Sequence, residues 1–208
     1  MTRGFVVTGT GTDIGKTVFA AGLTELIGGC YWKPVQAGME DGGDRETVRR
    51  LTGLGDDRLL PGSYRLNTPC SPHRAAECDR VTIDISRLAP PACDRPLVIE
   101  GAGGVLVPVT REATFADLFA RWRMPVILVA ATTLGTINHS LLSIEALRAR
   151  GVPVFGVAFV GEAVEDSEAT ICAMGNVRRL GRLPMLDPLD AATLSAAFAT
   201  AFAAEDFG

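Results

Sequence analysis

The segment Gly9–Thr17 (GTGTDIGKT) carries the residue types that bind phosphate. A run of backbone N–H groups, closed by the start of a helix, concentrates positive potential where phosphates can sit. Lys16 would reach the β- and γ-phosphates of a nucleoside triphosphate, and the Thr17 hydroxyl would ligate Mg²⁺. Gly15 would let the backbone approach a phosphate without a side-chain clash. Five residues separate Gly9 from Gly15, one more than in the usual GxxxxGK[ST] motif, so the segment is a variant phosphate loop.

Two carboxylates are candidate partners for that metal. Glu100 ends the apolar run Leu97–Glu100 and precedes a glycine-rich turn, where a carboxylate can hold Mg²⁺ or its water shell. A strand-terminal glutamate by itself is more often a solvated turn residue, but the phosphate loop favours the metal role. Asp44 opens a predicted helix, so it could ligate the metal or simply cap the helix, and the local sequence does not decide between them.

A second lysine, Lys33, ends another apolar run and precedes Pro34. Proline keeps the residue before it extended, so Lys33 would project from the carboxyl end of a strand. A cation there could stabilise charge on a transferring phosphoryl group and hold an anionic substrate. The alternative is an ordinary surface lysine with a solvated head.

Two further segments carry polar residues that could bind a ligand. A helix is predicted to start near Thr136–Asn138, and its first N–H groups could bind a carboxylate. His139 could act as a general base, but a single histidine at a helix start is usually structural. His73, within Ser71–His73, leaves the same two possibilities open.

The elements that must position these residues alternate along the chain. Short apolar runs alternate with segments of helical periodicity, which predicts an α/β fold with a parallel sheet covered on both faces. The predicted strands are Gly4–Thr8, Cys30–Val35, Leu97–Glu100, Val126–Ala130, Val154–Val160 and Val177–Leu180. The predicted helices are Lys16–Ile27, Asp44–Thr52, Ile137–Arg150, Asp166–Met174 and Ala191–Ala204. Ligands of such sheets bind beyond the carboxyl ends of the strands, where the motifs above fall.

The proline-rich stretch Pro61–Pro96 lacks periodicity and is predicted to be a long excursion with short elements. It is not expected to form a separate domain, so residues 1–208 are predicted to form a single domain.

Composition excludes several classes of function. The formal net charge of -4 offers no electrostatic basis for binding nucleic acid or an anionic membrane. The sequence has neither a signal peptide nor an apolar run long enough to span a bilayer, so a cytoplasmic protein is expected. The five cysteines are odd in number and contain no CxxC pair, which predicts free thiols and no zinc site.

Taken in order, these motifs resemble the dethiobiotin synthetase family. The correspondence covers GTGTDIGKT, the triplet Lys33-Pro34-Val35, Asp44, the segments Ser71–His73 and Glu100–Gly104, and Leu134–His139. It runs to about Gly161, with a weaker match at Gly181–Leu186. The resemblance implies a three-layer P-loop NTPase fold, with a mainly parallel central sheet flanked by helices. It also implies a ligase of biotin biosynthesis that uses Mg²⁺ and ATP to close the ureido ring of dethiobiotin from 7,8-diaminopelargonate and CO2 or bicarbonate.

The resemblance also assigns roles to residues. Lys16 and Lys33 would be catalytic, and Thr17, Asp44 and Glu100 would bind the metal. The nucleotide would be bound by Gly9, Thr12, Asp13, Ile14, Gly15, Lys16, Thr17, Val18, Asp44, Glu100, Gly101, Ala102, Gly103, Leu183, Pro184 and Met185. The substrate would be bound by Lys33, Ala37, Gly103, Gly104, Leu134, Gly135, Thr136, Ile137 and Asn138. The last five belong to a segment that in the family lies at a homodimer interface and holds the carboxylate of the substrate bound by the partner subunit.

The chain departs from the family pattern at three places. Ala37 replaces a serine or threonine that often bonds the substrate, and Gly11 replaces an aspartate that is common in the loop. The asparagine that typically reads adenine has no counterpart in Phe159-Val160-Gly161. We therefore expect a looser preference among nucleoside triphosphates.

Two other classes share the phosphate loop. Amidoligases of the cobyric or cobyrinic acid type usually carry a glutamine amidotransferase domain, for which 208 residues leave no room. Partition- and septum-type ATPases typically carry an extra lysine early in the loop, where this chain has Thr10, Gly11 and Thr12. Their membrane anchor also has no basic amphipathic counterpart in Ala191–Gly208.

Overall fold

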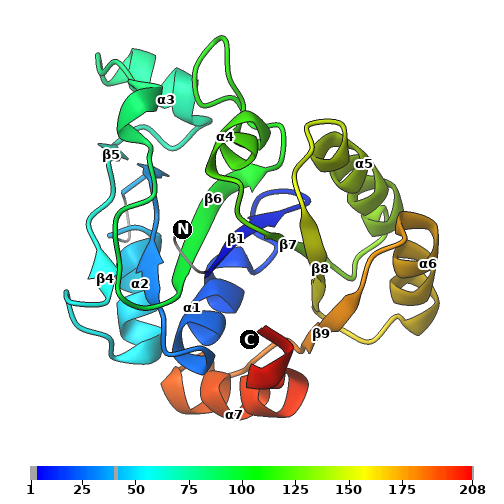
Figure 1. Ribbon diagram of the computed structural model, residues 1–208. Coiled ribbons are helices and arrows are strands. Elements are labelled where there is room, and N and C mark those ends of the chain that lie inside the picture. The colour runs from blue at the N-terminus through cyan, green and yellow to red at the C-terminus, as the bar shows by residue number, and fades with distance from the viewer. Residues whose placement is uncertain (1–3, 40–41, 208) are drawn as a thin grey trace.

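The computed structural model describes residues 4–39 and 42–207 and contains nine strands and seven α-helices in that part of the chain (Figure 1). The strands are β1 (Gly4–Gly9), β2 (Cys30–Trp32), β3 (Val35–Ala37), β4 (Leu59–Leu60), β5 (Tyr64–Leu66), β6 (Leu97–Gly104), β7 (Val126–Ala131), β8 (Val154–Val160) and β9 (Arg179–Leu183). The helices are α1 (Lys16–Leu26), α2 (Asp44–Thr52), α3 (Pro72–Cys78), α4 (Phe115–Trp122), α5 (Thr136–Arg148), α6 (Glu165–Gly175) and α7 (Ala191–Ala201). Two short 3₁₀ helices are η1 (Ile85–Arg87) and η2 (Ala204–Phe207).

Seven strands form one sheet in the order β4-β2-β6-β1-β7-β8-β9, and every neighbouring pair is parallel. The predicted α/β fold with a parallel central sheet is therefore confirmed. Strand β1 lies near the middle of the sheet, with β6 on one side and β7 on the other. The chain enters the sheet at β1 and adds strands in both directions, which creates a crevice at the carboxyl ends of β1 and β6.

Each face of the sheet is covered by its own hydrophobic core, as the three layers in Figure 1 show. Phe5 and Val7 of β1 pack with helices α1, α2 and α7. Val6, between them, points to the other face and packs with α4, α5 and α6. This alternation follows from the two-residue period of a strand, and it explains why strands buried on both faces read as continuous apolar runs.

The chain from Cys30 to Val35 does not form the single strand that the apolar run predicts. Strand β2 ends at Trp32, and the chain leaves the sheet at Lys33-Pro34 to form β3, which pairs with β5 in a second, two-stranded sheet. Pro34 has no N–H to donate to a ladder, and its carbonyl instead accepts bonds from the backbone of Ser63 and Tyr64.

Other boundaries also differ from expectation. Strand β6 continues past Glu100 to Gly104, because the glycines run close beside the end of β1, where Gly9 pairs with Gly104. Helix α4 was not predicted; it has only eight residues and is stabilised at its start by reciprocal bonds between Thr114 and Asp117. The stretch 61–96 does contain only short elements, β5, α3 and η1, as expected. Among the described residues, no helix is both long and apolar enough to cross a membrane.

Candidate active site

The loop between β1 and α1 has the backbone geometry of a phosphate cradle. Gly15 adopts a left-handed conformation (φ 86°) and is the N-cap of α1. A Cβ atom at Gly15 would lie 2.8 Å from Cγ1 of Val160, so both backbone conformation and space restrict this position to glycine. The free N–H groups at the start of α1 therefore face the loop without obstruction.

Lys16 begins α1 and is buried, with 7% of its surface exposed. Its ammonium donates a hydrogen bond of 2.5 Å to the Gly11 carbonyl across the loop. Burial lowers the pKa of Lys16, an effect that the nearby carboxylate of Glu100 opposes. The lysine is therefore an under-solvated cation in direct contact with the loop, as a phosphate-binding group requires.

The strand order brings the other candidate residues to this loop. Strand β6 pairs with β1 on one side, through Val7 and Glu100, and with β2 on the other, through Trp32 and Ile99. Lys33 follows Trp32 directly. Because neighbouring parallel strands end at the same edge, Lys33, Glu100 and the phosphate loop meet in space despite their separation in sequence.

Lys33 forms the centre of a buried charge cluster. Its ammonium lies 3.0 Å from Glu100 Oε1, donates a 3.0 Å bond to the Gly101 carbonyl and forms an ion pair with Asp44. Lys33 is 6% exposed and Glu100 is 1% exposed. Burial opposes the charged form of Lys33, but the carboxylates of Glu100 and Asp44 outweigh it and raise the pKa of Lys33. Burial likewise opposes ionisation of Asp44, but Lys33 holds the pKa of that carboxyl below its usual value. Both groups therefore stay charged at neutral pH.

Tyr31 also contacts this cluster, through Glu100, and was not predicted as a site residue from the sequence. Its hydroxyl donates a 2.7 Å bond to Glu100 Oε2, while the Thr17 hydroxyl donates a 2.8 Å bond to Glu100 Oε1. Tyr31 is fully buried, and burial together with the charge of Glu100 raises the pKa of Tyr31 well above its usual value. Both oxygens of Glu100 are thus held in fixed directions.

The residues proposed for the metal supply a suitable donor set. The hydroxyl of Thr17 and the carboxylates of Asp44 and Glu100 are hard oxygen donors of the kind that Mg²⁺ prefers. Gln36 orients Asp44, because its side-chain oxygen accepts a 3.0 Å bond from the Asp44 backbone N–H. No group of three or more His, Cys, Asp or Glu within residues 4–39 and 42–207 could hold a metal by itself. A Mg²⁺ ion would therefore take its remaining ligands from phosphate and water, as is usual for nucleotide-bound magnesium.

These residues line a cavity of about 770 Å³ at the carboxyl edge of the sheet. The predicted site residues that line it are Thr12, Asp13, Ile14, Gly15, Lys16, Thr17, Val18, Lys33, Ala37, Asp44, Glu100, Ala102 and Gly103. Ser71 and Pro72, from the motif that resembles the family, also line it. Lining residues that the sequence did not suggest are Gln36, Thr47, Pro69, Cys70 and Val107. Most of these are small or uncharged residues from the irregular parts of the chain, so no motif marked them.

Some predicted site residues lie outside this cavity. Gly9, Gly101 and Gly104 lie along β1 and β6 beside it, and a Cβ at Gly104 would be 3.6 Å from the Gly9 carbonyl. Leu183 is the last residue of β9 and pairs with Val160, and Pro184 and Met185 follow the strand. The segment Leu134–Asn138 does not reach the cavity of its own chain, and Leu134 is fully exposed.

The two histidines also lie outside the cavity lining. Nδ1 of His73 is buried and has no hydrogen-bond partner among the described residues. His139 is exposed on α5, next to the left-handed Gly135.

Two solved structures illustrate the similarity of fold. The chain superimposes on a ParA family ATPase from Chlorobium tepidum with a TM-score of 0.55, 12% identity and coverage of 98% of this chain and 92% of that one. It superimposes on the MinC:MinD cell division protein complex of Aquifex aeolicus with a TM-score of 0.59, 13% identity and coverage of 94% and 86%. At these identities the similarity shows the fold alone. The fold and the loop define a P-loop nucleotide-binding protein.

Sequence comparison gives the family. The family model described as an AAA domain matches residues 3–193. The ATP-dependent dethiobiotin synthetase BioD of Rhizorhabdus wittichii is 67% identical over 207 residues, which cover 100% of this chain and 99% of that protein. The protein of the same name from Novosphingobium aromaticivorans is 68% identical and covers 98% of both chains. The chain belongs to the ATP-dependent dethiobiotin synthetase family.

Proposed function

We propose that this protein is a ligase that uses Mg-ATP and CO2 to convert 7,8-diaminopelargonate into dethiobiotin. The observation that carries the proposal is the cluster of Lys33, Asp44 and Glu100 beside the phosphate loop, in a chain of this family. A buried lysine held between two carboxylates at the mouth of a phosphate cradle can neutralise anionic groups that form next to the γ-phosphate.

The phosphate loop and the start of α1 hold the triphosphate in this proposal. The N–H groups that follow Gly15 bind the phosphates, and Lys16 moves its ammonium from the Gly11 carbonyl to the β- and γ-phosphate oxygens. Thr17, Asp44 and Glu100 hold Mg²⁺. When bound there, Mg²⁺ supplies positive charge that offsets the charge of the β- and γ-phosphates.

The reaction proceeds in three steps. One amine of the substrate adds to CO2 and loses a proton, which gives a carbamate. A carbamate oxygen then accepts the γ-phosphoryl group, and ADP leaves. The second amine attacks the carbamoyl carbon and loses a proton, while phosphate departs with the electrons of the C–O bond and the ureido ring closes.

Lys33 and Lys16 act on different groups during this reaction. Lys33 lines the same cavity as Ala37 and Gly103 and would bind the carbamate oxygens, and its raised pKa keeps the ammonium protonated throughout. Lys16 would follow the γ-phosphoryl group from ATP to the carbamate. Phosphoryl transfer of this kind depends mainly on positioning and charge stabilisation, which two buried ammonium groups supply.

The substrate carboxylate is proposed to be bound by a second copy of the chain. The segment 134–138 at the start of α5 does not reach its own cavity, and apolar side chains stand exposed next to it, with Leu134 at 107% and Leu142 at 56%. A homodimer that buries these leucines would place the N–H groups of α5 in the cavity of the partner. The assembly would act in the cytoplasm.

The dimer can be tested separately from the chemistry. The double variant Leu134→Glu and Leu142→Glu should elute as a monomer in size-exclusion chromatography and lose turnover, while it retains binding of Mg-ATP. A stable dimer that keeps wild-type activity would remove this part of the proposal.

The proposed reaction is tested by turnover with 7,8-diaminopelargonate, bicarbonate and Mg-ATP. Release of phosphate should require both the diamine and bicarbonate, and Lys16→Ala and Lys33→Ala should each abolish it. Arg65→Gln, an exposed change outside the cavity, serves as the control and should leave the rate unaltered. Phosphate release that does not depend on the diamine would indicate only an ATPase and would contradict the ligase assignment.

A further inference from the structure

A second cavity, of about 1090 Å³, lies at the opposite edge of the sheet, where the strands begin. Its walls include Gly4 and Phe5 at the start of β1 and the prolines that precede β6 and β7, Pro96 and Pro125. The phosphate loop leaves the other end of β1, six residues away, which is about 20 Å of extended chain. The two cavities have no lining residue in common among the residues that the structure describes. The amino-edge cavity is therefore separate from the active site.

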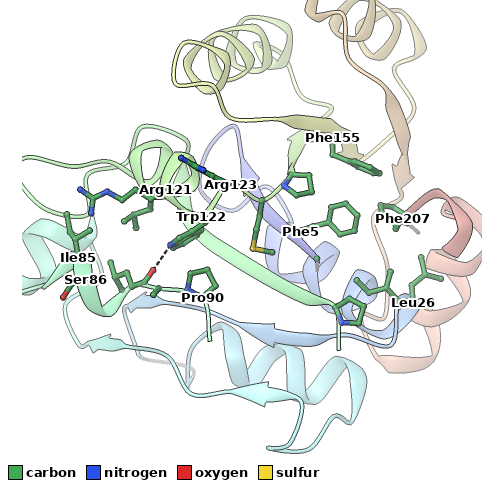
Figure 2. Close-up of a pocket in the computed structure, with 18 of the residues that line it drawn as sticks. Phe5, Leu26, Ile85, Ser86, Pro90, Arg121, Trp122, Arg123, Phe155 and Phe207 are labelled. Carbon is green, nitrogen blue, oxygen red and sulfur yellow. Dashed lines mark hydrogen bonds between the residues drawn. The ribbon is translucent and has the colours of Figure 1, made fainter. Parts of the chain in front are cut away.

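One end of the amino-edge cavity is aromatic. The ring of Phe5 lies 4.7 Å from that of Phe155 and 5.8 Å from that of Phe207, measured between centroids. Figure 2 shows these three rings gathered at one end, with Leu26 beside them. A wall of this kind favours an apolar ligand, because each aromatic ring offers a large flat surface with little freedom to lose on binding.

The other end of the amino-edge cavity carries positive charge. Arg121 and Arg123 flank Trp122 in the sequence at the end of α4, and Figure 2 shows both arginines away from the phenylalanine rings. Trp122 is held in the wall by a 2.7 Å bond from its ring N–H to the Leu88 carbonyl. No acidic residue lines the cavity along the described chain, and neither arginine side chain has a hydrogen-bond or ion-pair partner there. The two guanidinium groups are thus available to an anion.

We propose that the amino-edge cavity binds an amphipathic organic anion, with an aromatic or long aliphatic body and one carboxylate or sulfonate group. The apolar body would lie against the three phenylalanine rings, and the anionic group would reach the arginines, whose planar forks suit a carboxylate or sulfonate. A nucleoside triphosphate does not fit this description, because the described part of the cavity wall offers no α-helix start, no glycine-rich loop and few polar groups to hold several phosphates.

The proposal is tested with a matched pair of fluorescent probes on the whole protein. Anilinonaphthalene sulfonate carries the anionic group, and phenylnaphthylamine has nearly the same rings without it. We expect the sulfonate to bind saturably at one site per chain, to be displaced by decanoate and to be unaffected by saturating Mg-ATP.

Substitutions at the cavity wall test whether the probes bind in this cavity. Ala89 is an exposed residue at its wall, and Ala89→Trp should fill the space and weaken both probes at least tenfold. The pair Arg121→Gln and Arg123→Gln should weaken the sulfonate about tenfold and leave the neutral probe unchanged. Arg65→Gln, an exposed arginine outside the cavity, is the control and should change neither.

Three results would overturn the proposal. These are displacement of the sulfonate by Mg-ATP, wild-type affinity in the Ala89→Trp variant, or equal weakening of both probes in the arginine variants. The melting temperature of each variant is measured in parallel. If Ala89→Trp unfolds early, the arginine pair still decides the question, since both side chains are exposed and their removal leaves the core intact.

Discussion

Replacing Lys33 by methionine should destabilise the protein strongly as well as inactivate it. Methionine keeps an unbranched side chain of similar length but removes the ammonium that contacts Glu100, Asp44 and the Gly101 carbonyl. The carboxylates of Glu100 and Asp44 would then lose the ammonium that they share, with only the weaker influence of Lys16 left nearby, and Glu100 is only 1% exposed. Removing one partner of a buried ion pair costs about 3–5 kcal/mol. We expect about 3 kcal/mol, near the lower limit, because Asp44 is 30% exposed and water can solvate it in part.

Thermal and denaturant unfolding measure this effect. For a chain of this size each kcal/mol corresponds to about 2–4 °C, so the melting temperature should fall by about 6–12 °C. Lys16→Met is the matched control. Lys16 is equally buried, but the hydrogen bond of its ammonium within the described structure goes to a carbonyl, and burial already lowers the pKa of Lys16. Lys16→Met should lower the free energy of unfolding by less than about 1 kcal/mol. Both variants should lack turnover, so stability alone separates their roles.

The pH dependence of stability tests the charge cluster independently, because the wild type and Lys33→Met should respond to acid in opposite directions. The pKa of Asp44 is lowered by folding, so its contribution is present above the usual value of 3.8 and is lost as the pH falls through the folded pKa. The pKa of Lys33 is raised, so its contribution is present below 10.5 and is lost as the pH rises through the folded pKa. The cluster therefore stabilises the wild type throughout the neutral range. In Lys33→Met, acidification from neutral pH should instead raise stability, because burial opposes the ionisation of Asp44 and protonating this carboxyl relieves its repulsion with Glu100.

The reasoning is refuted if Lys33→Met and Lys16→Met unfold within about 0.5 kcal/mol of each other, a difference no larger than that of an ordinary surface substitution. It is also refuted if Lys33→Met gains no stability on mild acidification.

Three further predictions concern the same site. Tyr31→Phe removes one bond to the buried Glu100 carboxylate, so the free energy of unfolding should fall by about 1.5–3 kcal/mol in denaturant titrations, and an unchanged value would contradict the role of Tyr31. Because Val160-Gly161 replaces the adenine-reading asparagine, initial rates with ATP, CTP and GTP should be similar, whereas a strong preference for ATP would defeat that expectation. Lys16 and Lys33 are the only lysines in the chain, so peptide mass spectrometry after treatment with acetic anhydride can follow each ε-amine separately. Lys16, with its lowered pKa, should react first and be protected by Mg-ATP, and faster labelling of Lys33 would contradict the charge assignments.

Motifs that depend on contiguous residues could be predicted from the sequence. The phosphate loop is one such motif, because its glycines, Lys16 and the start of α1 act through backbone conformation within a few residues. The strands of the central sheet, except the two-residue β4, were also recognisable, since burial on both faces leaves continuous apolar runs.

Short elements were not predictable in the same way. Helix α4 has eight residues, too few for a clear helical period, and β3 and β5 have three residues each. Such elements are stabilised by what they pack against more than by their own sequence. The run Cys30–Val35 was predicted to be one strand, and neither its division at Lys33-Pro34 nor the partner that β3 finds in β5 was predicted.

The sequence by itself therefore determined the chemistry: which groups bind phosphate, which carry charge and on what kind of sheet they stand. The tertiary structure decided how these groups are arranged. Strand order places β6 between β1 and β2, and only that order sets Lys33 against Glu100 and Asp44, with Tyr31 beneath them and Gln36 holding Asp44 in place. The amino-edge cavity arises likewise from strand starts and a helix end that are distant in sequence. The physical reason is that strand pairing joins residues far apart along the chain, and no local pattern records which strands become neighbours.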